Sequence, residues 1–304
     1  MAELRRIGRS ELFTPPLILG GNVFGWTIDE RESFAVLDAF VAGGGRMIDT
    51  ADVYAAFVPG KLGGESEAII GQWLKRRGRR DDVLITTKVG MLEIDGVKGL
   101  APAHVAKAID ASLKRLGTDY VDLYLAHQDD PDQDQGAVAE AFGALVKAGK
   151  VRATGASNFT ATRLSSAIDA QERKGVARYQ ALQNQYNLLE RGGYEGAVQD
   201  ACVEQGIGMT PFYGLAGGYL TGKYRADEPP PPDSRAAHAP EVCAAYSTEQ
   251  SFAKIEQLRR NAQARGGTMS EAALRFVLDT PGVDGLIVAP RRLDHFASMG
   301  LGPR

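Results

Sequence analysis

The chain has few cysteines and no long hydrophobic run. These two features argue against a disulfide-rich protein, a cysteine metal cluster and a membrane-spanning protein. Only two cysteines occur among 304 residues. Cys202 and Cys243 are far apart, so they form neither a disulfide framework nor a metal cluster, and this usage is typical of a reducing compartment. No apolar run approaches the roughly 18 residues that a membrane span needs, and the N-terminus lacks the apolar core of a signal peptide. We therefore expect a cytoplasmic protein without a metal site and without a membrane partner.

The chain also lacks a strong excess of either charge. Its formal net charge is −3, and 24% of its residues are charged. Nucleic-acid-binding proteins usually carry a clear positive excess, so we expect no nucleic-acid partner. The basic run at 75–80 follows an amphipathic stretch and is interpreted as a solvated helix end. The signature G-x-G-x-x-G is absent as well, so any dinucleotide is not bound in the Rossmann manner.

Eight short apolar runs alternate with amphipathic stretches. The runs are too continuously apolar for strands that face solvent on one side, which indicates a parallel sheet covered on both faces. From the second run to the seventh, the starts lie about 30 residues apart, the length of a βα unit. Eight such units favour one (β/α)8 barrel domain over residues 1–304. The predicted strands are 17–21, 47–51, 83–89, 121–127, 151–157, 181–186, 207–212 and 285–289.

Helices are predicted between the strands, together with two irregular segments. Residues 4–16 alternate in character and end at two prolines, which predicts a hairpin that caps the bottom of the barrel. Four prolines at 229–232 predict a long rim loop before the eighth strand, and an extra helix follows at 251–264. The other predicted helices are 29–41, 65–76, 102–116, 138–148, 160–173, 194–204 and 270–278.

Reactive side chains follow consecutive predicted strands. The active sites of parallel barrels lie at the C-terminal strand ends, where this sequence places Asp49, Tyr54, Lys88 and His127. An ammonium group lowers the pKa of a neighbouring tyrosine, and a carboxylate holds that ammonium in place. With a histidine, the set can protonate a carbonyl oxygen while a cofactor supplies hydride. Each residue alone would be interpreted as structural, and it is their coincidence that favours catalysis.

Seven ordered motifs resemble those of the aldo-keto reductases, and the resemblance runs from about residue 4 to residue 298. The motifs look most like the bacterial branch that also contains the potassium-channel β-subunits. The resemblance implies a (β/α)8 barrel, NADPH or NADP⁺ as cofactor, and a catalytic tetrad of Asp49, Tyr54, Lys88 and His127, with Tyr54 as proton donor. The motifs lie at 44–54, 64–67, 85–88, 113–124, 155–159, 183–187 and 220–224.

The resemblance also implies where the nicotinamide and the pyrophosphate lie. Ser157, Asn158 and Gln183 fall where the family binds the nicotinamide carboxamide. Phe212 takes the place of the aromatic residue that stacks on the nicotinamide, and Lys223 matches a lysine near the pyrophosphate. The further cofactor contacts expected on this basis are Gly21, Asn22, Tyr213, Gly214, Leu215 and Gly217.

The adenosine end departs from the family pattern. Arg291 and Arg292 stand in the segment that holds the 2′-phosphate, and two arginines favour NADPH over NADH. His295 replaces a glutamine and Met299 replaces an asparagine that the family uses at the adenine. We expect His295 to contact the cofactor even so.

The segments that form the substrate pocket differ further from the family pattern. Family members usually continue with a helix and a loop that wall the substrate pocket, whereas this chain stops at residues 301–304. We expect a short last helix and a more open pocket, with Trp26 and Phe57 as substrate contacts, although Trp26 could equally serve packing alone.

Three functions follow from the sequence. The first is NADPH-dependent reduction of an aldehyde or ketone. The second is a tailoring reductase for a keto sugar or a cyclic imine in bacterial secondary metabolism. The third is a cofactor-binding regulatory subunit like the channel β-subunits. The sequence names neither the small-molecule carbonyl substrate nor the oligomeric state, and a homo-oligomer remains open.

Overall fold

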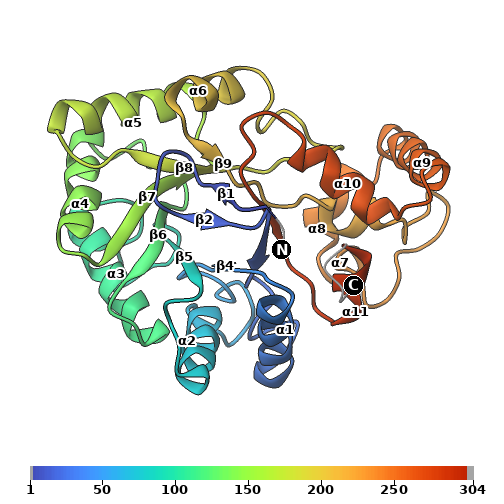
Figure 1. Cartoon of the computed structure of the whole chain (residues 1–304), viewed down its shortest axis with the longest axis horizontal. Coiled ribbons are helices and arrows are strands. Elements are labelled where there is room, and N and C mark those ends of the chain that lie inside the picture. Colours follow the sequence, from blue (N-terminus) through green and yellow to red (C-terminus); the bar gives the residue numbers. More distant parts are fainter. Residues whose placement is uncertain (1–2, 300–304) are drawn as a thin grey trace.

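The computed structural model describes residues 3–299, and eight parallel strands form its centre (Figure 1). The strand order is β10-β3-β4-β5-β6-β7-β8-β9. An isolated parallel bridge between Met209 and Val283 joins the two ends of this order, so the strands form a barrel, as predicted. The strands are β3 (Leu17–Gly20), β4 (Met47–Asp49), β5 (Leu84–Val89), β6 (Val121–Ala126), β7 (Val151–Ser157), β8 (Tyr179–Gln183), β9 (Gly208–Met209) and β10 (Leu286–Val288).

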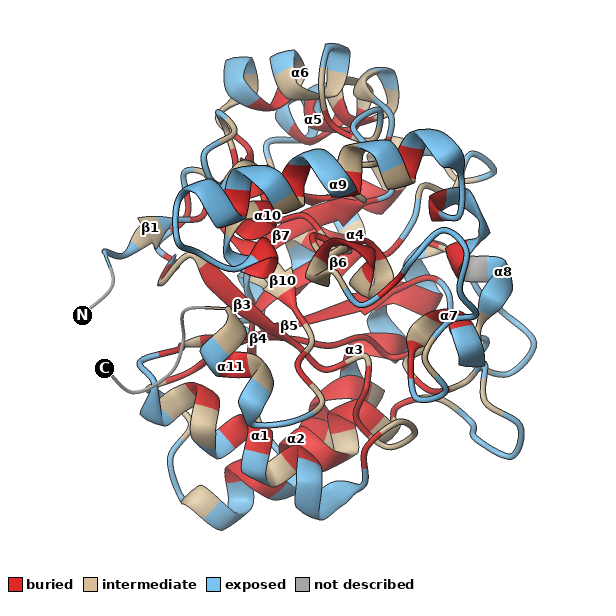
Figure 2. Cartoon of the chain, turned by 90° about the vertical axis from the view of Figure 1, so that its right-hand side faces the viewer, coloured by how far each residue is buried: buried red, intermediate tan, exposed pale blue. Residues whose placement is uncertain are grey.

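Helices cover the outside of the barrel, with buried inner faces and exposed outer faces (Figure 2). The first helix begins as its sequence predicts. The Asp29 side chain accepts a hydrogen bond from the Glu32 amide, and the Glu32 side chain accepts one from the Asp29 amide, which together form a capping box. The last is short, as expected. The helices are α1 (Glu30–Ala42), α2 (Glu65–Arg77), α3 (Pro102–Leu116), α4 (Gln135–Lys147), α5 (Ala161–Lys174), α6 (Ala197–Gln205), α10 (Met269–Leu278) and α11 (Asp294–Ser298).

Several predicted elements are shorter than expected, and two of them differ most clearly. The strand expected at 207–212 is reduced to β9. The Thr210 and Phe212 amides still donate toward β8, to the Leu182 and Asn184 oxygens, whereas Pro211 has no amide hydrogen to donate on the side of β10. The helix expected from residue 194 begins at Ala197. Gly196 has φ 85°, a left-handed conformation that an α-helix does not contain.

The predicted N-terminal hairpin is present and closes one end of the barrel. Strand β1 (Arg5–Arg6) pairs antiparallel with β2 (Phe13–Thr14), and the hairpin lies across the centre of the ring in Figure 1. Ile7 and Leu12 belong to a buried cluster with Ile18 and Met47. The Gly8 amide donates a hydrogen bond of 2.7 Å to Asp284, which precedes β10. The C-terminal strand ends therefore remain for a functional site.

The rim segment between β9 and β10 is more ordered than predicted. Short helices interrupt it around the proline run, so the expectation of an irregular loop is wrong in part. Tyr219 stacks on Tyr224 with ring centroids 4.1 Å apart, and both pack in a second buried cluster with Tyr246 and Ile255. The elements are η1 (Ala216–Thr221), α7 (Arg235–His238), α8 (Pro240–Cys243), η2 (Ala244–Tyr246) and α9 (Glu249–Ala264), the last of which confirms the extra helix.

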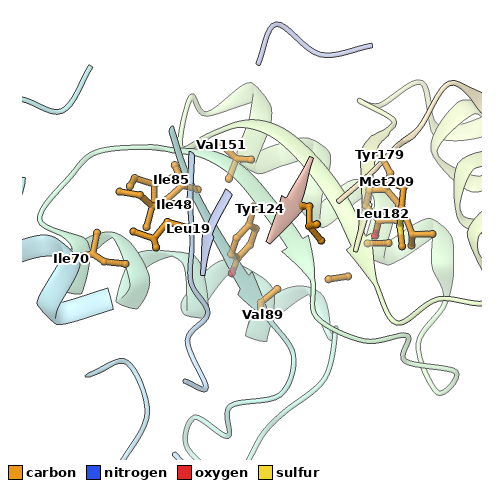
Figure 3. Packing of buried hydrophobic residues seen from close by; sticks show 14 of the residues in the cluster. Leu19, Ile48, Ile70, Ile85, Val89, Tyr124, Val151, Tyr179, Leu182 and Met209 are labelled. Carbon is orange, nitrogen blue, oxygen red and sulfur yellow. The ribbon is translucent and has the colours of Figure 1, made fainter. Parts of the chain in front are cut away.

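The main hydrophobic core lies between the strands and the surrounding helices. Figure 3 shows Leu19, Ile48, Ile85 and Tyr124 on adjacent strands, all of them buried. In α2, Ile70 and Trp73 are fully buried on the face turned to the sheet. Within residues 3–299, every helix is too short or too polar to cross a membrane.

The close packing of α2 on α3 gives a first prediction. A Cβ atom at Gly71 would lie 2.2 Å from the backbone oxygen of Arg115, which cannot move away easily. We expect Gly71→Ala to lower the free energy of unfolding by about 1–3 kcal/mol, as overpacking usually does. Denaturant unfolding measures the effect.

The matched control is Gly136→Ala in α4. There the nearest atoms belong to the side chains of Asp134 and Lys174, both at 3.0 Å. These side chains can shift, and alanine favours a helix over glycine by up to about 1 kcal/mol. Equal losses of stability in the two variants would contradict the packing argument.

Candidate active site

The four predicted tetrad residues meet at the C-terminal end of the barrel. Asp49 is the last residue of β4, and Lys88 lies near the end of β5. His127 directly follows β6, where its amide continues the ladder by donating to the Val89 oxygen at 2.9 Å. Tyr54 lies in the loop after β4. Consecutive parallel strands therefore bring together residues that are far apart in the sequence.

Lys88 is the centre of this group. Its ammonium is fully buried and donates to Asp49 Oδ1 at 2.6 Å, to the Thr50 oxygen at 2.8 Å and to the Tyr54 hydroxyl oxygen at 2.8 Å. The Tyr54 hydroxyl donates to Asp49 Oδ1 at 3.3 Å. A buried charge with three acceptors is well compensated, so its position is fixed.

The structure reverses the expected direction of the Tyr54 pKa. Burial, followed by the Asp49 carboxylate, raises the pKa of the Tyr54 hydroxyl well above its usual range. Burial also lowers the pKa of Lys88, against the attraction of Asp49. These shifts favour the phenol form of Tyr54, which can donate a proton, over the phenolate.

His127 is a neutral imidazole. Burial, and then the Lys88 charge, lower the pKa of His127 well below its usual range. Its ring meets that of Tyr54 edge-on, with centroids 6.0 Å apart. Its Nδ1 is buried and has no hydrogen-bond partner within the described part of the chain. One ring nitrogen of the neutral form carries a proton, so His127 can donate a hydrogen bond to a substrate oxygen.

The three residues predicted to hold a carboxamide lie beside the tetrad. Asn158 has φ 57°, a conformation that asparagine tolerates, and its Nδ2 donates to the His127 oxygen at 2.8 Å. The Ser157 hydroxyl donates to the Gln183 oxygen at 2.7 Å. Gln183 Nε2 donates to Asp49 Oδ2 at 2.8 Å. Gln183 therefore also fixes the second oxygen of the tetrad carboxylate.

A cavity of about 530 Å³ opens above these residues. Almost all of the predicted site residues, which come from the strand ends and the rim, line this cavity. Those that line it are Asn22, Trp26, Asp49, Tyr54, Phe57, His127, Ser157, Asn158, Gln183, Phe212, Tyr213, Gly214, Leu215, Gly217, Lys223, Arg291 and His295.

Three predicted residues do not line the cavity. Lys88 lies behind Tyr54 and donates a hydrogen bond to its hydroxyl. Gly21 contacts the tetrad from behind, since its amide donates a hydrogen bond of 2.7 Å to the backbone oxygen of Asp49. Arg292 is paired with Asp294 at 2.5 Å, and both side chains are exposed. The placement of Arg292 therefore does not support its predicted role at the cofactor, because its charge is directed to solvent and to Asp294.

The sequence predicted that the rim loop at 214–250 walls the pocket, but it named none of the residues that follow the proline run and none from α10. Arg235 and His238, on α7, line the cavity, as does Ser270 on α10. A basic residue that follows a proline-rich rim loop is a signal that could have pointed to Arg235. The position of Ser270 has no such signal, because it depends on how α10 packs.

One end of the cavity is cationic. Lys223 is exposed at the edge of the cavity, and partial loss of its hydration followed by the Arg291 charge lowers its pKa, with Arg235 acting in the same direction. Gly217 and Gly218, with φ 64° and 97°, shape the adjacent backbone. A cluster of mutually repelling cations beside a glycine turn fits a polyanionic ligand.

Trp26 and Phe57 form an aromatic part of the cavity wall. Their rings meet edge-on with centroids 5.1 Å apart, and Phe57 is 61% exposed. The Arg235 guanidinium lies 5.4 Å from the Trp26 ring centroid. The expectation of a more open pocket depends on the C-terminal end, and residues 300–304 lie outside the described part of the chain.

Comparison with known proteins identifies the family of this chain. The sequence profile of the "Aldo/keto reductase family" matches residues 16–299. The uncharacterized oxidoreductase YrpG of Bacillus subtilis is 31% identical over 300 residues, which cover 96% of this chain and 88% of that protein.

Two further relatives differ in their names. The aldo-keto reductase YhdN of the same organism is 32% identical over 269 residues, covering 88% of this chain and 76% of that protein. A probable voltage-gated potassium channel subunit beta of Arabidopsis thaliana is 29% identical over 297 residues, covering 95% and 88%. With the profile match across nearly the whole length, these relatives show that the chain belongs to the aldo/keto reductase family, a family of oxidoreductases.

Proposed function

We propose that this protein reduces the carbonyl group of a small aldehyde or ketone to an alcohol, with NADPH as the hydride donor. The observation that carries the proposal is the 2.8 Å hydrogen bond from Lys88 to the Tyr54 hydroxyl at the wall of an open cavity. An acid that lines the cavity next to a fixed positive charge is what protonation of a developing alkoxide requires.

The residues at the cationic end fit a phosphorylated dinucleotide. Lys223 and Arg291 would bind phosphate oxygens, and Gly217 and Gly218 let the backbone approach them closely. Phe212 lines the cavity between this end and Tyr54, where its ring can stack on a nicotinamide. The cofactor, when bound, supplies the hydride.

The chain's own residues handle the proton. Tyr54 donates its hydroxyl proton to the carbonyl oxygen as negative charge develops there. Lys88 stabilises the phenolate that remains, and Asp49 holds Lys88 in place. His127, which is neutral, donates a hydrogen bond that orients the carbonyl oxygen. The aromatic pair Trp26 and Phe57 excludes water on the substrate side.

Arg291 gives a prediction on cofactor choice. Its guanidinium lines the cavity and is held by the Asp233 oxygen at 2.7 Å. We expect Arg291→Ala to weaken NADPH binding by about tenfold or more, the usual size of a charge-assisted hydrogen bond, and to leave NADH binding nearly unchanged. Quenching of protein fluorescence on titration measures both affinities.

The neighbouring arginine is the matched control. Arg292→Ala removes the same charge one residue away, but that side chain is exposed and paired with Asp294. We expect its NADPH affinity to stay within about twofold of the wild type, as for most exposed ion pairs. Equal effects of the two substitutions would show that net charge, and not a contact of Arg291, is responsible.

A regulatory role is the second candidate, favoured by the similarity to a potassium channel subunit beta. The two candidates differ in turnover. A protein that binds NADPH, reduces no member of a broad aldehyde and ketone panel, and co-purifies with a partner would support the regulatory role. Turnover of one panel member with a tyrosine-dependent rate would support the reductase. The same panel, extended to keto sugars and cyclic imines, tests the tailoring alternative.

A further inference from the structure

An aspartate that the proposed chemistry does not use lies buried behind the tetrad. Asp52 stands in the turn between Asp49 and Tyr54, and its side chain is fully buried. Neither carboxyl oxygen is paired with a side chain in residues 3–299, and the backbone amide of Val53 is the hydrogen-bond donor that faces the carboxyl. An isolated carboxylate is so costly to bury that such a group normally neutralises by binding a proton.

Among the residues that the structure describes, the cations near Asp52 are already paired with other carboxylates. It interacts with Glu67 on α2, Arg115 on α3 and Lys88 on β5, and with Tyr124 on β6. Arg115 Nε already donates to Glu67 at 2.6 Å, and Lys88 is paired within the tetrad. The Tyr124 hydroxyl is likewise without a partner among the described residues. Burial, and then the Glu67 charge, raise the pKa of Asp52 to about 8.

We propose that Asp52 is a positioning residue, protonated at neutral pH, whose ionisation in alkaline solution disfavours the phenolate form of Tyr54 and so favours carbonyl reduction over alcohol oxidation. This inference rests on the proposed function. Reduction uses the Tyr54 phenol as an acid, whereas oxidation uses its phenolate as a base. Burial and the Asp49 carboxylate raise the pKa of Tyr54 most, and the charge of an ionised Asp52 adds a smaller contribution in the same direction.

The test compares wild type with Asp52→Asn, which is neutral at every pH. We expect equal kcat/KM for alcohol oxidation below about pH 7, and a variant that is about three- to tenfold faster above about pH 9, when Asp52 of the wild type is ionised. The ratio of the variant's kcat/KM to that of the wild type should change around the pKa of Asp52, which is about 8. A ratio that stays constant with pH would overturn the proposal, since a merely structural role changes the rate equally at every pH.

Asp284→Asn is the matched control. Burial also raises the pKa of Asp284, but this residue lies at the opposite end of the barrel, where it accepts a hydrogen bond from Gly8. We expect its pH profile to match that of the wild type. A pH-dependent gain in this variant as well would contradict a specific role for Asp52.

Two measurements test the protonation of Asp52 without relying on enzyme turnover, and the first is infrared spectroscopy. The infrared spectrum of the wild type at neutral pH should contain a protonated-carboxyl band that Asp52→Asn lacks and that disappears in alkaline solution. If the band is absent at neutral pH, the inference is wrong even if the protein is a reductase. If the band is present but the wild type turns over no carbonyl or alcohol, the proposed function fails and the proposed influence of Asp52 on Tyr54 fails with it.

Stability gives the second measurement. The folded protein holds the Asp52 proton up to about pH 8, whereas the unfolded chain releases it near the usual value of about 4. The folded state therefore binds more protons across this interval, and the contribution of Asp52 to stability falls as pH rises through it. We expect Tm to decline between these pH values more steeply in the wild type than in Asp52→Asn. Parallel declines would overturn the protonated state.

Discussion

Tyr54→Phe is expected to lower kcat for carbonyl reduction by about 10²- to 10⁴-fold, the usual contribution of a positioned general acid. The substitution removes only the hydroxyl that Lys88 contacts at 2.8 Å, and the ring keeps its edge-on contact with His127. Steady-state kinetics with the best member of an aldehyde and ketone panel gives the rate. NADPH affinity, read from fluorescence quenching, should not change.

The predicted result for Tyr54→Phe distinguishes an effect on the chemical step from an effect on cofactor binding. A loss in kcat with intact NADPH affinity means that the hydroxyl acts in the transition state and not in the ground state. Tyr213 also lines the cavity, so Tyr213→Phe is a matched removal of a hydroxyl from the same site. We expect a much smaller loss from it. Near wild-type turnover by Tyr54→Phe would show that another group supplies the proton.

Lys88→Met is expected to produce the second large effect, on both rate and stability. It removes the ammonium that stabilises the Tyr54 phenolate, and loss of one such electrostatic contact commonly costs about 10²- to 10³-fold in kcat. It also leaves Asp49, which is 1% exposed, without its ion-pair partner. Breaking a buried pair from one side costs about 3–5 kcal/mol of folding stability. Denaturant unfolding and steady-state kinetics measure the two losses.

A double variant separates the two losses. Asp49→Asn combined with Lys88→Met removes both charges, and a neutral pair of similar volume is tolerated well in a protein interior. We expect it to regain most of the stability but none of the turnover. Lys150→Met, which breaks the exposed pair with Asp110, should change neither by much. Recovery of turnover in the double variant would show that the Lys88 charge is not required for the reaction.

The sequence predicted the tetrad because its residues follow consecutive strands, and a parallel barrel brings all strand ends to one side. The order of Asp49, Lys88 and His127 along the chain is therefore also their order around the barrel. The same regularity predicted the N-terminal hairpin and most helices. Local signals were enough for these elements, because apolar periodicity and capping residues act over a few positions.

Packing between distant segments was not predictable in the same way. The rim between β9 and β10 is held by Tyr219, Tyr224 and Tyr246, whose contacts no local pattern in the sequence indicates. Arg291 and Arg292 are adjacent and chemically identical, yet only the first reaches the cavity. Which of the two does so depends on the direction of each side chain at the start of α11.

The scarcity of cysteine, of net charge and of long apolar runs excluded several classes of protein, and the eight-fold pattern predicted the barrel and the positions of its candidate reactive residues. Only the tertiary structure sets the electrostatic surroundings of these residues. Burial and the Asp49 carboxylate raise the pKa of Tyr54 well above its usual range, and Asp52 lies buried with no side-chain partner in the described residues. A pKa depends on burial and on every charge nearby, and both arise only when strands and helices from across the chain come together.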